Sequence, residues 1–372
     1  VSFDMSTNAA YAEKLTLLGT GNIDGIGNDW DNVIKGTSGN NTLDGREGAD
    51  TLLGGAGNDT YIVDSLGDSL TDGGGIDTVV VFGLSYTLKS GFENLTLDPS
   101  IDDDADLTGN SSKNILTGND GSNVLSGGGS NDTLIGNDGD DSLVGGTGAD
   151  TMSGGDDADA YVVDNSLDVI IENVGEGEDS LSVSVTYVLS LTTEMETIFL
   201  TGTGGIGIRA SDTDNIITGN GAANKIYAMD GADTIMGGLG NDSIDGGAGD
   251  DTLFGEAGAD VMTGGLGDDT FIFEESSAFL NVDHIRDFHV DAVPAGNNDF
   301  LDLSDIISDF DPLVDVLSQF VLIRDSGANT TVRVDIDGSG TDFGFVLIAV
   351  LDNVNGLTGE VALYNSGNLI ID

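Results

Sequence analysis

The chain has 372 residues and carries 66 acidic residues against 10 basic ones, which gives a formal net charge of −56. A folded protein with this charge repels itself unless cations neutralise it, so composition alone predicts bound metal ions. Nucleic acid and anionic membranes are excluded as partners on the same ground, because there is no basic surface to bind their phosphates.

A nine-residue pattern organises the chain from residue 27 onward. Residues 237–272 show it most clearly, as GGLGNDSID, GGAGDDTLF, GEAGADVMT and GGLGDDTFI. Glycine stands at the first and fourth places, aspartate at the sixth and an apolar residue at the eighth. Seventeen such units form three phased runs, at residues 27–62, 109–162 and 210–272. Repetition at a short fixed period is typical of a solenoid, in which each unit buries its apolar face by stacking on its neighbours.

Each unit divides into two parts with different chemistry. The first six residues favour a turn, because glycine permits backbone angles closed to other residues. The last three residues favour a short strand whose eighth-place side chain points inward. Glycine-rich turns also let carbonyl oxygens converge beside the sixth-place carboxylate, and calcium prefers six to eight such oxygen ligands. The unit therefore predicts calcium binding at the turns.

The connecting segments also have strand character, since apolar and polar residues alternate in them. Examples are Leu84–Leu88, Asn94–Leu97 and Val185–Leu189. After Phe273 the pattern stops, and we predict a short helix at 302–307, a second at 313–320, and strands at 320–324, 330–336 and 343–350. The predicted divisions are partial connector strands at 1–26, repeat block one at 27–62, connector strands at 63–108, block two at 109–162, connector strands at 163–209, block three at 210–272 and a C-terminal domain at 273–372.

The nonapeptides resemble the hemolysin-type calcium-binding repeats of the repeats-in-toxin (RTX) family. The resemblance implies an all-β fold: a parallel β-roll, or β-solenoid, with a small, mainly-β C-terminal domain. It also implies that two nonapeptides make one turn and that each calcium ion is shared by sixth-place residues of units i and i+2. The metal ligands expected on this basis are Asp50, Asp59, Asp132, Asp141, Asp150, Asp159, Asp233, Asp242, Asp251, Asp260 and Asp269.

Pairing these residues predicts the number of ions. Five pairs contain only aspartate: Asp132/Asp150, Asp141/Asp159, Asp233/Asp251, Asp242/Asp260 and Asp251/Asp269. Six further pairs join an asparagine to an aspartate, because each block opens with two asparagine units. An asparagine offers only a neutral oxygen, so these sites should be weaker or empty, and the amides could form a ladder without metal. We expect five firm calcium ions and up to eleven.

The last hundred residues resemble the C-termini of large adhesins that Gram-negative bacteria export by type I secretion. The segments that carry this resemblance are 283–288, 298–306, 335–338, 345–351 and 368–372. It implies an ABC transporter complex as a partner, an extracellular or cell-surface location, and export without an N-terminal signal. No membrane span is expected, because no run of 18 apolar residues exists.

Three functions fit the sequence. We favour a non-catalytic, calcium-dependent structural module of a surface adhesin or matrix protein, with cell-surface or self-assembly partners possible. The alternatives are the non-catalytic C-terminal part of a secreted protease, lipase or epimerase, and a self-assembling surface-layer or filament protein. No enzyme is expected within the chain, because His284 and His289 accompany no catalytic motif. The acidic run Asp102–Asp104 is either a solvated loop or an extra calcium site.

Overall fold

The computed structural model describes residues 2–8, 11–274, 277–278, 281–290, 298–307, 310, 316–335, 344–354, 357 and 359–371. The chain forms two compact units, Val1–Asp179 and Ser180–Asp372. Both are built almost entirely of short parallel strands, which confirms the all-β solenoid predicted from the sequence.

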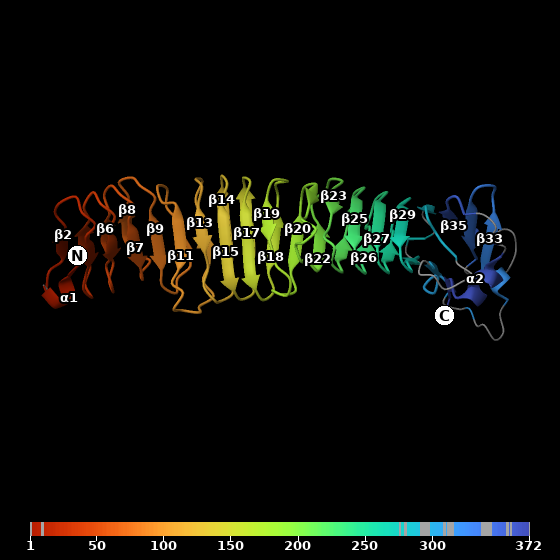
Figure 1. The fold of residues 1–372 in the computed structure, drawn as a ribbon, viewed down its shortest axis with the longest axis horizontal. Coiled ribbons are helices and arrows are strands. Elements are labelled where there is room, and N and C mark those ends of the chain that lie inside the picture. The colour runs from red at the N-terminus through yellow and green to blue at the C-terminus, as the bar shows by residue number, and fades with distance from the viewer. Residues whose placement is uncertain are drawn as a thin grey trace. The chain divides into compact units, whose positions relative to one another are not determined.

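In the first unit, alternate strands belong to different sheets (Figure 1). The odd-numbered strands pair in chain order, and the even-numbered strands do the same on the other side of each turn. The odd-numbered sheet contains β1 (Ser2–Asp4), β3 (Asp24–Ile26), β5 (Thr42–Asp44), β7 (Thr60–Val63), β9 (Thr78–Val81), β11 (Asn94–Leu97), β13 (Ile115–Thr117), β15 (Thr133–Asp138), β17 (Thr151–Asp156) and β19 (Val169–Ile171). The even-numbered strands are β2 (Lys14–Thr16), β4 (Val33–Lys35), β6 (Thr51–Leu53) and β8 (Ser69–Thr71) in one sheet, and β10 (Tyr86–Thr87), β12 (Leu107–Thr108), β14 (Val124–Gly129), β16 (Ser142–Thr147) and β18 (Ala160–Val163) in another; α1 is Met5–Asn8.

The second unit follows the same rule. One of its sheets runs through β20 (Ser180–Val183), β22 (Thr197–Leu200), β24 (Ile216–Thr218), β26 (Thr234–Met236), β28 (Thr252–Phe254), β30 (Thr270–Ile272), β32 (Phe300–Asp302) and β36 (Leu369–Ile370). The other runs through β21 (Tyr187–Val188), β23 (Gly207–Arg209), β25 (Lys225–Asp230), β27 (Ser243–Ala248), β29 (Val261–Leu266), β31 (Asp283–Ile285), β35 (Val346–Leu351), β34 (Thr330–Val334) and β33 (Val321–Asp325).

The strand register confirms that two nonapeptides make one turn. Within the repeats, each residue pairs in parallel with the residue 18 positions later, as Leu134 does with Met152 and Leu253 with Phe271. Most repeat strands cover places seven to nine of a unit, as predicted. Others, such as β15, continue through the first three places of the next unit. The longer strands arise because the turn backbone there also pairs between neighbouring turns.

The core is a stacked row of eighth-place side chains. Leu52, Leu134, Leu143 and Leu253 are fully buried, and Ile244 is 1% exposed. Because each pairs with its equivalent one turn away, the core is continuous along each unit. Burying one such side chain stabilises the fold by about 1.5–3 kcal/mol. The stacked row therefore supplies the main apolar contribution to the stability of the fold.

The C-terminal region adds strands to the solenoid sheets instead of forming sheets of its own. β31 pairs with β29 and β32 pairs with β30, both in parallel. The predicted strands at 320–324, 330–336 and 343–350 correspond to β33, β34 and β35, which include the antiparallel pairs β33/β34 and β34/β35.

The helices of this region differ from the predictions. The helix predicted at 302–307 is wrong: the residues are the end of β32 and a turn, in which Asp302 accepts hydrogen bonds from Ser304. Of the second predicted helix, the described part is the 3₁₀ helix η1 (Leu317–Gln319), and residues 313–315 lie outside the described residues. Helix α2 (Glu360–Ser366) was not predicted. No helix in the described part of the chain is long and apolar enough to cross a membrane.

Fourth-place glycines are required by the close stacking of turns. Gly240 has φ +128°, a conformation that strongly favours glycine, and a methyl group on its Cα would lie 2.7 Å from the Ala222 carbonyl carbon. Larger residues at this place would push neighbouring turns apart.

Candidate metal centre

The sixth-place aspartates lie at the junction between the turn and the strand of each unit. Their position follows from the repeat, because the turn ends at place six and the strand starts at place seven. All eleven predicted ligands are at most 2% exposed. Carboxylates are rarely buried to this degree unless they are paired or bind a metal.

The structure brings the members of all five predicted all-aspartate pairs into contact. In each pair the backbone N–H of the earlier residue donates a hydrogen bond to Oδ1 of the later one. The donor–acceptor distances are 2.7 Å for Asp132/Asp150, 2.8 Å for Asp141/Asp159, 2.9 Å for Asp233/Asp251, 2.7 Å for Asp242/Asp260 and 3.0 Å for Asp251/Asp269. The aspartates therefore form two columns along each block, one for each set of alternate turns.

In most of these residues the second carboxylate oxygen is buried and lacks a hydrogen-bond partner. An unsatisfied buried polar group costs about 1–3 kcal/mol, and a charged one costs more. One such group would be an exception in a native fold, whereas a regular series is typical of sites that bind cations. Buried Oδ2 atoms without a partner occur at Asp50, Asp59, Asp77, Asp132, Asp141, Asp150, Asp233, Asp242, Asp251, Asp260 and Asp269.

Backbone carbonyls point into the same space. A methyl group on Gly127, at the first place of its unit, would lie 2.6 Å from Asp132 Oδ2 and 2.7 Å from the Gly145 carbonyl oxygen. A methyl group on Gly237 would likewise lie 2.9 Å from Asp242 Oδ2 and 2.8 Å from the Gly255 carbonyl oxygen. A carboxylate and a carbonyl that face each other across a small buried space repel, unless a cation lies between them.

Burial raises the pKa of these carboxyl groups, because an ionised group loses its hydration there. The pKa rises to about 8 for Asp251 and to about 7 for Asp141, Asp233 and Asp242. The backbone hydrogen bond each accepts lowers its pKa and only partly offsets the effect of burial. Without a cation, the fold thus favours the protonated acids.

The donor set fits calcium. The oxygens are carboxylate and carbonyl atoms, the ligands that calcium prefers, and neighbouring turns supply them to one point. Sulfur is absent because the chain has no cysteine. A bound cation would satisfy the Oδ2 atoms and remove the repulsion between carboxylates of one column.

The columns continue beyond the predicted blocks. Six further aspartate pairs show the same N–H to Oδ1 contact, and each ends on a residue of a connector or of the C-terminal region. They are Asp50/Asp68, Asp59/Asp77, Asp150/Asp168, Asp159/Asp179, Asp260/Asp283 and Asp269/Asp299. Asp68, Asp77 and Asp168 keep the 18-residue spacing and could have been found from it. Asp179, Asp283 and Asp299 follow at 20, 23 and 30 residues, so the repeat pattern gave no signal for them.

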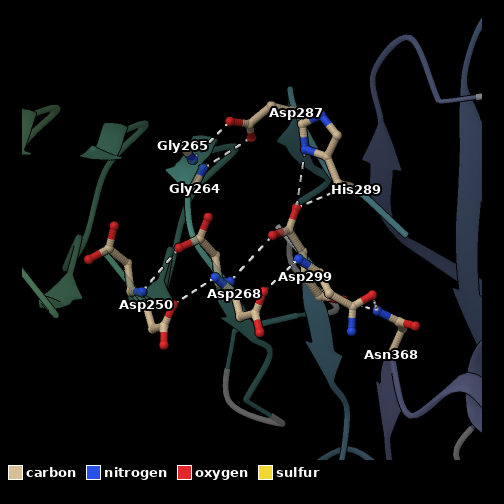
Figure 2. Close-up of polar contacts among 11 residues, drawn as sticks. Asp250, Gly264, Gly265, Asp268, Asp287, His289, Asp299 and Asn368 are labelled. Atoms are coloured by element: carbon tan, nitrogen blue, oxygen red, sulfur yellow. Dashed lines mark hydrogen bonds and ion pairs between the residues drawn. The ribbon is translucent and has the colours of Figure 1, made fainter. Parts of the chain in front are cut away.

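The end of block three shows how the last carboxylates are held (Figure 2). Asp287 accepts hydrogen bonds from the backbone N–H groups of Gly264 and Gly265, at 3.0 and 2.9 Å. Asp299 Oδ2 accepts the backbone N–H of His289 at 2.7 Å, and the His289 ring Nδ1 lies 3.7 Å from the same oxygen. These contacts fix the carboxylates that follow the last repeat.

The sixth-place asparagines that open each block donate mainly to backbone carbonyls, and Asn32 also donates to the Asn28 side chain at 3.1 Å. Asn123 Oδ1 accepts the N–H of Asn119 at 3.0 Å, and its Nδ2 donates to the Ala105 carbonyl at 2.9 Å. Asn41 and Asn114 make equivalent contacts with the preceding turn. The expected ladder of side-chain amides is therefore wrong, because the Nδ2 groups of these asparagines donate to backbone carbonyls of the preceding turn.

The fifth place has a role that the sequence analysis missed. Asn or Asp there accepts a backbone hydrogen bond from the fifth-place residue of the next turn, the reverse of the sixth-place direction. Asp250 accepts from Asp268 at 2.8 Å, and Asp268 accepts from Asn298 at 2.8 Å. These side chains link turns but are exposed or half-exposed, unlike the sixth-place column.

The remaining candidates have structural contacts. Asp102–Asp104 are exposed, and the Asp103 carbonyl and Asp104 carboxylate bind backbone or side-chain donors of the next turn. His284 Nδ1 lies 3.1 Å from Asp352, and both histidine side chains are about half exposed, at 44% for His284 and 51% for His289.

Comparison with known proteins agrees with this geometry. The model of the RTX calcium-binding nonapeptide repeat, in four copies, matches residues 26–61, 108–143, 135–168, 209–244 and 237–271. These three stretches of the chain therefore carry RTX calcium-binding repeats. The RTX matches cover the three blocks, and the last match in the first unit reaches only Asp168.

Other similarities are weak. No curated protein matches this chain. Among solved structures it is similar to the extracellular lipase LipA from Serratia marcescens, at 15% identity and a TM-score of 0.20. The match covers 81% of this chain and 45% of the lipase chain, so the chain spans less than half of that protein. A likeness at this level carries no argument about activity.

Proposed function

We propose that the chain is the calcium-dependent folding and structural module of an extracellular protein that leaves the cell by type I secretion. The observation that carries the proposal is the series of buried sixth-place carboxylates, in which residues such as Asp132, Asp233 and Asp251 have an Oδ2 atom without a hydrogen-bond partner. These carboxylates oppose folding unless cations bind them. Calcium binding would then supply part of the free energy of folding, because no site exists in the unfolded chain.

The role fits a protein that must cross an envelope before it folds. At low calcium the ionised columns repel, so the chain stays unfolded and can be threaded. Outside the cell, calcium in the ~10⁻⁴–10⁻³ M range typical of extracellular modules would fold it. The predicted ligands Asp50, Asp59 and the nine sixth-place aspartates of blocks two and three thus act as a folding switch.

The decisive measurement is β-sheet content with and without calcium. Circular dichroism in a chelator should show a mostly unfolded chain, and calcium should restore the β signal. Magnesium serves as the control, because it demands a small octahedral site and retains its water. A full β signal in chelator would contradict the proposal.

The number of ions is a second measure. The structure contains eleven aspartate pairs, so we propose about eleven strong sites, whereas the repeats alone gave five. Calorimetric titration of the chain should count them. The asparagine pairs are proposed to be weak or empty, since the amide oxygen is neutral and in most of these residues already accepts a backbone N–H.

Residues 273–372 are proposed to be the secretion domain, which an ABC transporter complex recognises. The support is the sequence resemblance of 283–306 and 345–372 to secreted adhesins. Co-expression with a type I transporter should place the full chain in the medium, and a chain truncated after Phe273 should stay in the cell. Export of the truncated chain would contradict this assignment.

We propose that the exported protein is a non-catalytic surface adhesin or matrix protein. Both histidines have carboxylate neighbours and accompany no catalytic motif, which favours a structural role. Electron microscopy of the calcium-loaded chain distinguishes the alternatives: single particles support an adhesin segment, whereas sheets or filaments support a surface-layer protein.

A further inference from the structure

Glu172 is a buried carboxylate that the repeat pattern does not explain. It follows β19 directly and occupies the first place of a turn, where the repeats carry glycine. The residue is only 5% exposed. Its Oε2 accepts a hydrogen bond from the Tyr161 hydroxyl, whereas its Oε1 is buried and has no hydrogen-bond partner.

Glu172 meets the end of one aspartate column. One carboxylate oxygen each from Asp159, Glu172 and Asp179 lies within 4.8 Å of the other two, and all three residues are buried. Asp179 also accepts the backbone N–H of Asp159 at 2.8 Å, so the two aspartates are held in place. Three carboxylates in one buried space repel strongly unless a cation joins them.

Block one shows what is special about this position. Its last unit also carries a tyrosine at the eighth place, Tyr61, and its next turn begins with the shorter acid Asp72. There the tyrosine hydroxyl donates to the Thr71 carbonyl at 3.1 Å, and Asp72 is only half-buried. Glu172 accepts the hydroxyl of its tyrosine, whereas Asp72 interacts with the carboxyl group of Asp77 and is not the acceptor of the Tyr61 hydroxyl.

We propose that Asp159, Glu172 and Asp179 together bind one calcium ion at the end of block two. The site differs from the repeat sites because it adds a third carboxylate from a first-place residue, beyond the residues that match the family. The inference rests on the proposed calcium binding of the columns. More ligand charge in a rigid setting raises calcium affinity, so this site should be among the tightest in the chain.

The test is calorimetric titration of Glu172→Gln, which keeps the shape of the side chain and removes its charge. Glu178→Gln, an exposed residue of the same connector, is the matched control. The variant E172Q should lose one tight calcium ion, or bind it at least tenfold more weakly, while E178Q binds as the wild type does. Unchanged binding by E172Q overturns the site, whereas a wild-type chain that binds no calcium overturns the proposed function as well.

A second measurement does not require E172Q to fold. Terbium replaces calcium and emits when a nearby tyrosine is excited, and Tyr161 touches the proposed site. In a Tyr61→Phe background, which removes the equivalent tyrosine of block one, Tyr161→Phe should abolish a distinct part of the sensitised emission with no change in terbium stoichiometry. Equal emission from the two proteins would show that no ion lies beside Tyr161.

Discussion

At the scale of the residue, the behaviour of each sixth-place aspartate depends on what its second oxygen meets. Asp251 is the clearest example: it is 1% exposed, its Oδ1 binds the Asp233 N–H, and its Oδ2 has no partner. With calcium, such an oxygen is a ligand. In chelator the same oxygen is an unsatisfied buried charge, so one substitution should have opposite effects under the two conditions.

We predict this reversal for Asp251→Asn. With calcium, the variant should lose one or two ions, because Asp251 belongs to the pairs with Asp233 and Asp269. Each lost ion costs about 2.7 kcal/mol when free calcium is 100 times the dissociation constant. In chelator, any residual fold should become more stable. Urea unfolding in both conditions measures the two effects.

The control for that experiment is the adjacent Asp250→Asn. Asp250 is exposed, and an asparagine would still accept the Asp268 N–H. Its unfolding should match the wild type in both conditions. An equal loss in both variants would mean that general charge, and not the column, controls calcium binding.

The asparagine at the start of a column should contribute to the stability of the fold through its hydrogen bonds and not through calcium binding. Asn123→Ala removes the contacts with Asn119 and Ala105 in a position that is 1% exposed, which should lower the free energy of unfolding by about 1–3 kcal/mol. Asn131→Ala, which removes one exposed contact with Ala149, should cost less. Calorimetric titration should show the same calcium count for both. A lower count in N123A would mean that Asn123 is a ligand.

At the scale of the element, the space between a carboxylate and a carbonyl limits the size of the residue at the first place of a turn. Gly127 belongs to β14, and its missing side chain leaves room between Asp132 Oδ2 and the Gly145 carbonyl. An added methyl group would occupy the place where an ion must lie. The glycine at this place therefore has a requirement of space rather than of backbone angle.

We predict that Gly127→Ala removes the ion of the Asp132/Asp150 pair and destabilises the calcium-bound fold by about 1–3 kcal/mol, as overpacking does. Gly129→Ala is the control in the same strand, because its nearest neighbour would be the Thr147 hydroxyl at 3.3 Å. Calcium titration and thermal unfolding of both variants measure the difference. Full calcium binding by G127A would place the ion elsewhere.

At the scale of the whole molecule, protons and calcium should compensate for the same excess of charge. Burial raises the pKa values of the column aspartates above 3.8, to about 6 for Asp132 and Asp260 and to about 8 for Asp251. A group whose pKa is higher in the folded state stabilises the fold when it is protonated. In chelator, that stabilisation is complete below about pH 4 and is lost as the pH rises through 6–8.

The chelated chain should therefore gain β structure on acidification and lose it again near neutral pH. Circular dichroism of the chelated chain between pH 4 and 8 measures this change, and the calcium-loaded chain should vary less over the same range. Calcium affinity should also fall in acid, because protons compete for the carboxylates. A chelated chain with constant β content would show that carboxylate repulsion does not limit folding.

The sequence by itself determined the features that depend on neighbouring residues. The nine-residue period predicted the turn, the short strand, the inward eighth-place side chain and the sixth-place aspartates. It could do so because a glycine-rich turn and a three-residue strand are specified locally. The contacts of the five predicted all-aspartate pairs followed from the 18-residue turn, while their calcium occupancy stays a prediction.

Only the tertiary structure decided how the columns end. Asp179, Asp283 and Asp299 stand at irregular distances from their partners, yet strand pairing brings them to the same place in the turn. Connector length can vary because the additional residues lie outside the sheets. The spacing between turns, in contrast, is fixed by hydrogen bonds. The partners of the asparagines and the burial of Glu172 are also contacts between turns. The sequence set the repeat, and the stacking of turns decided which additional carboxylates join its columns.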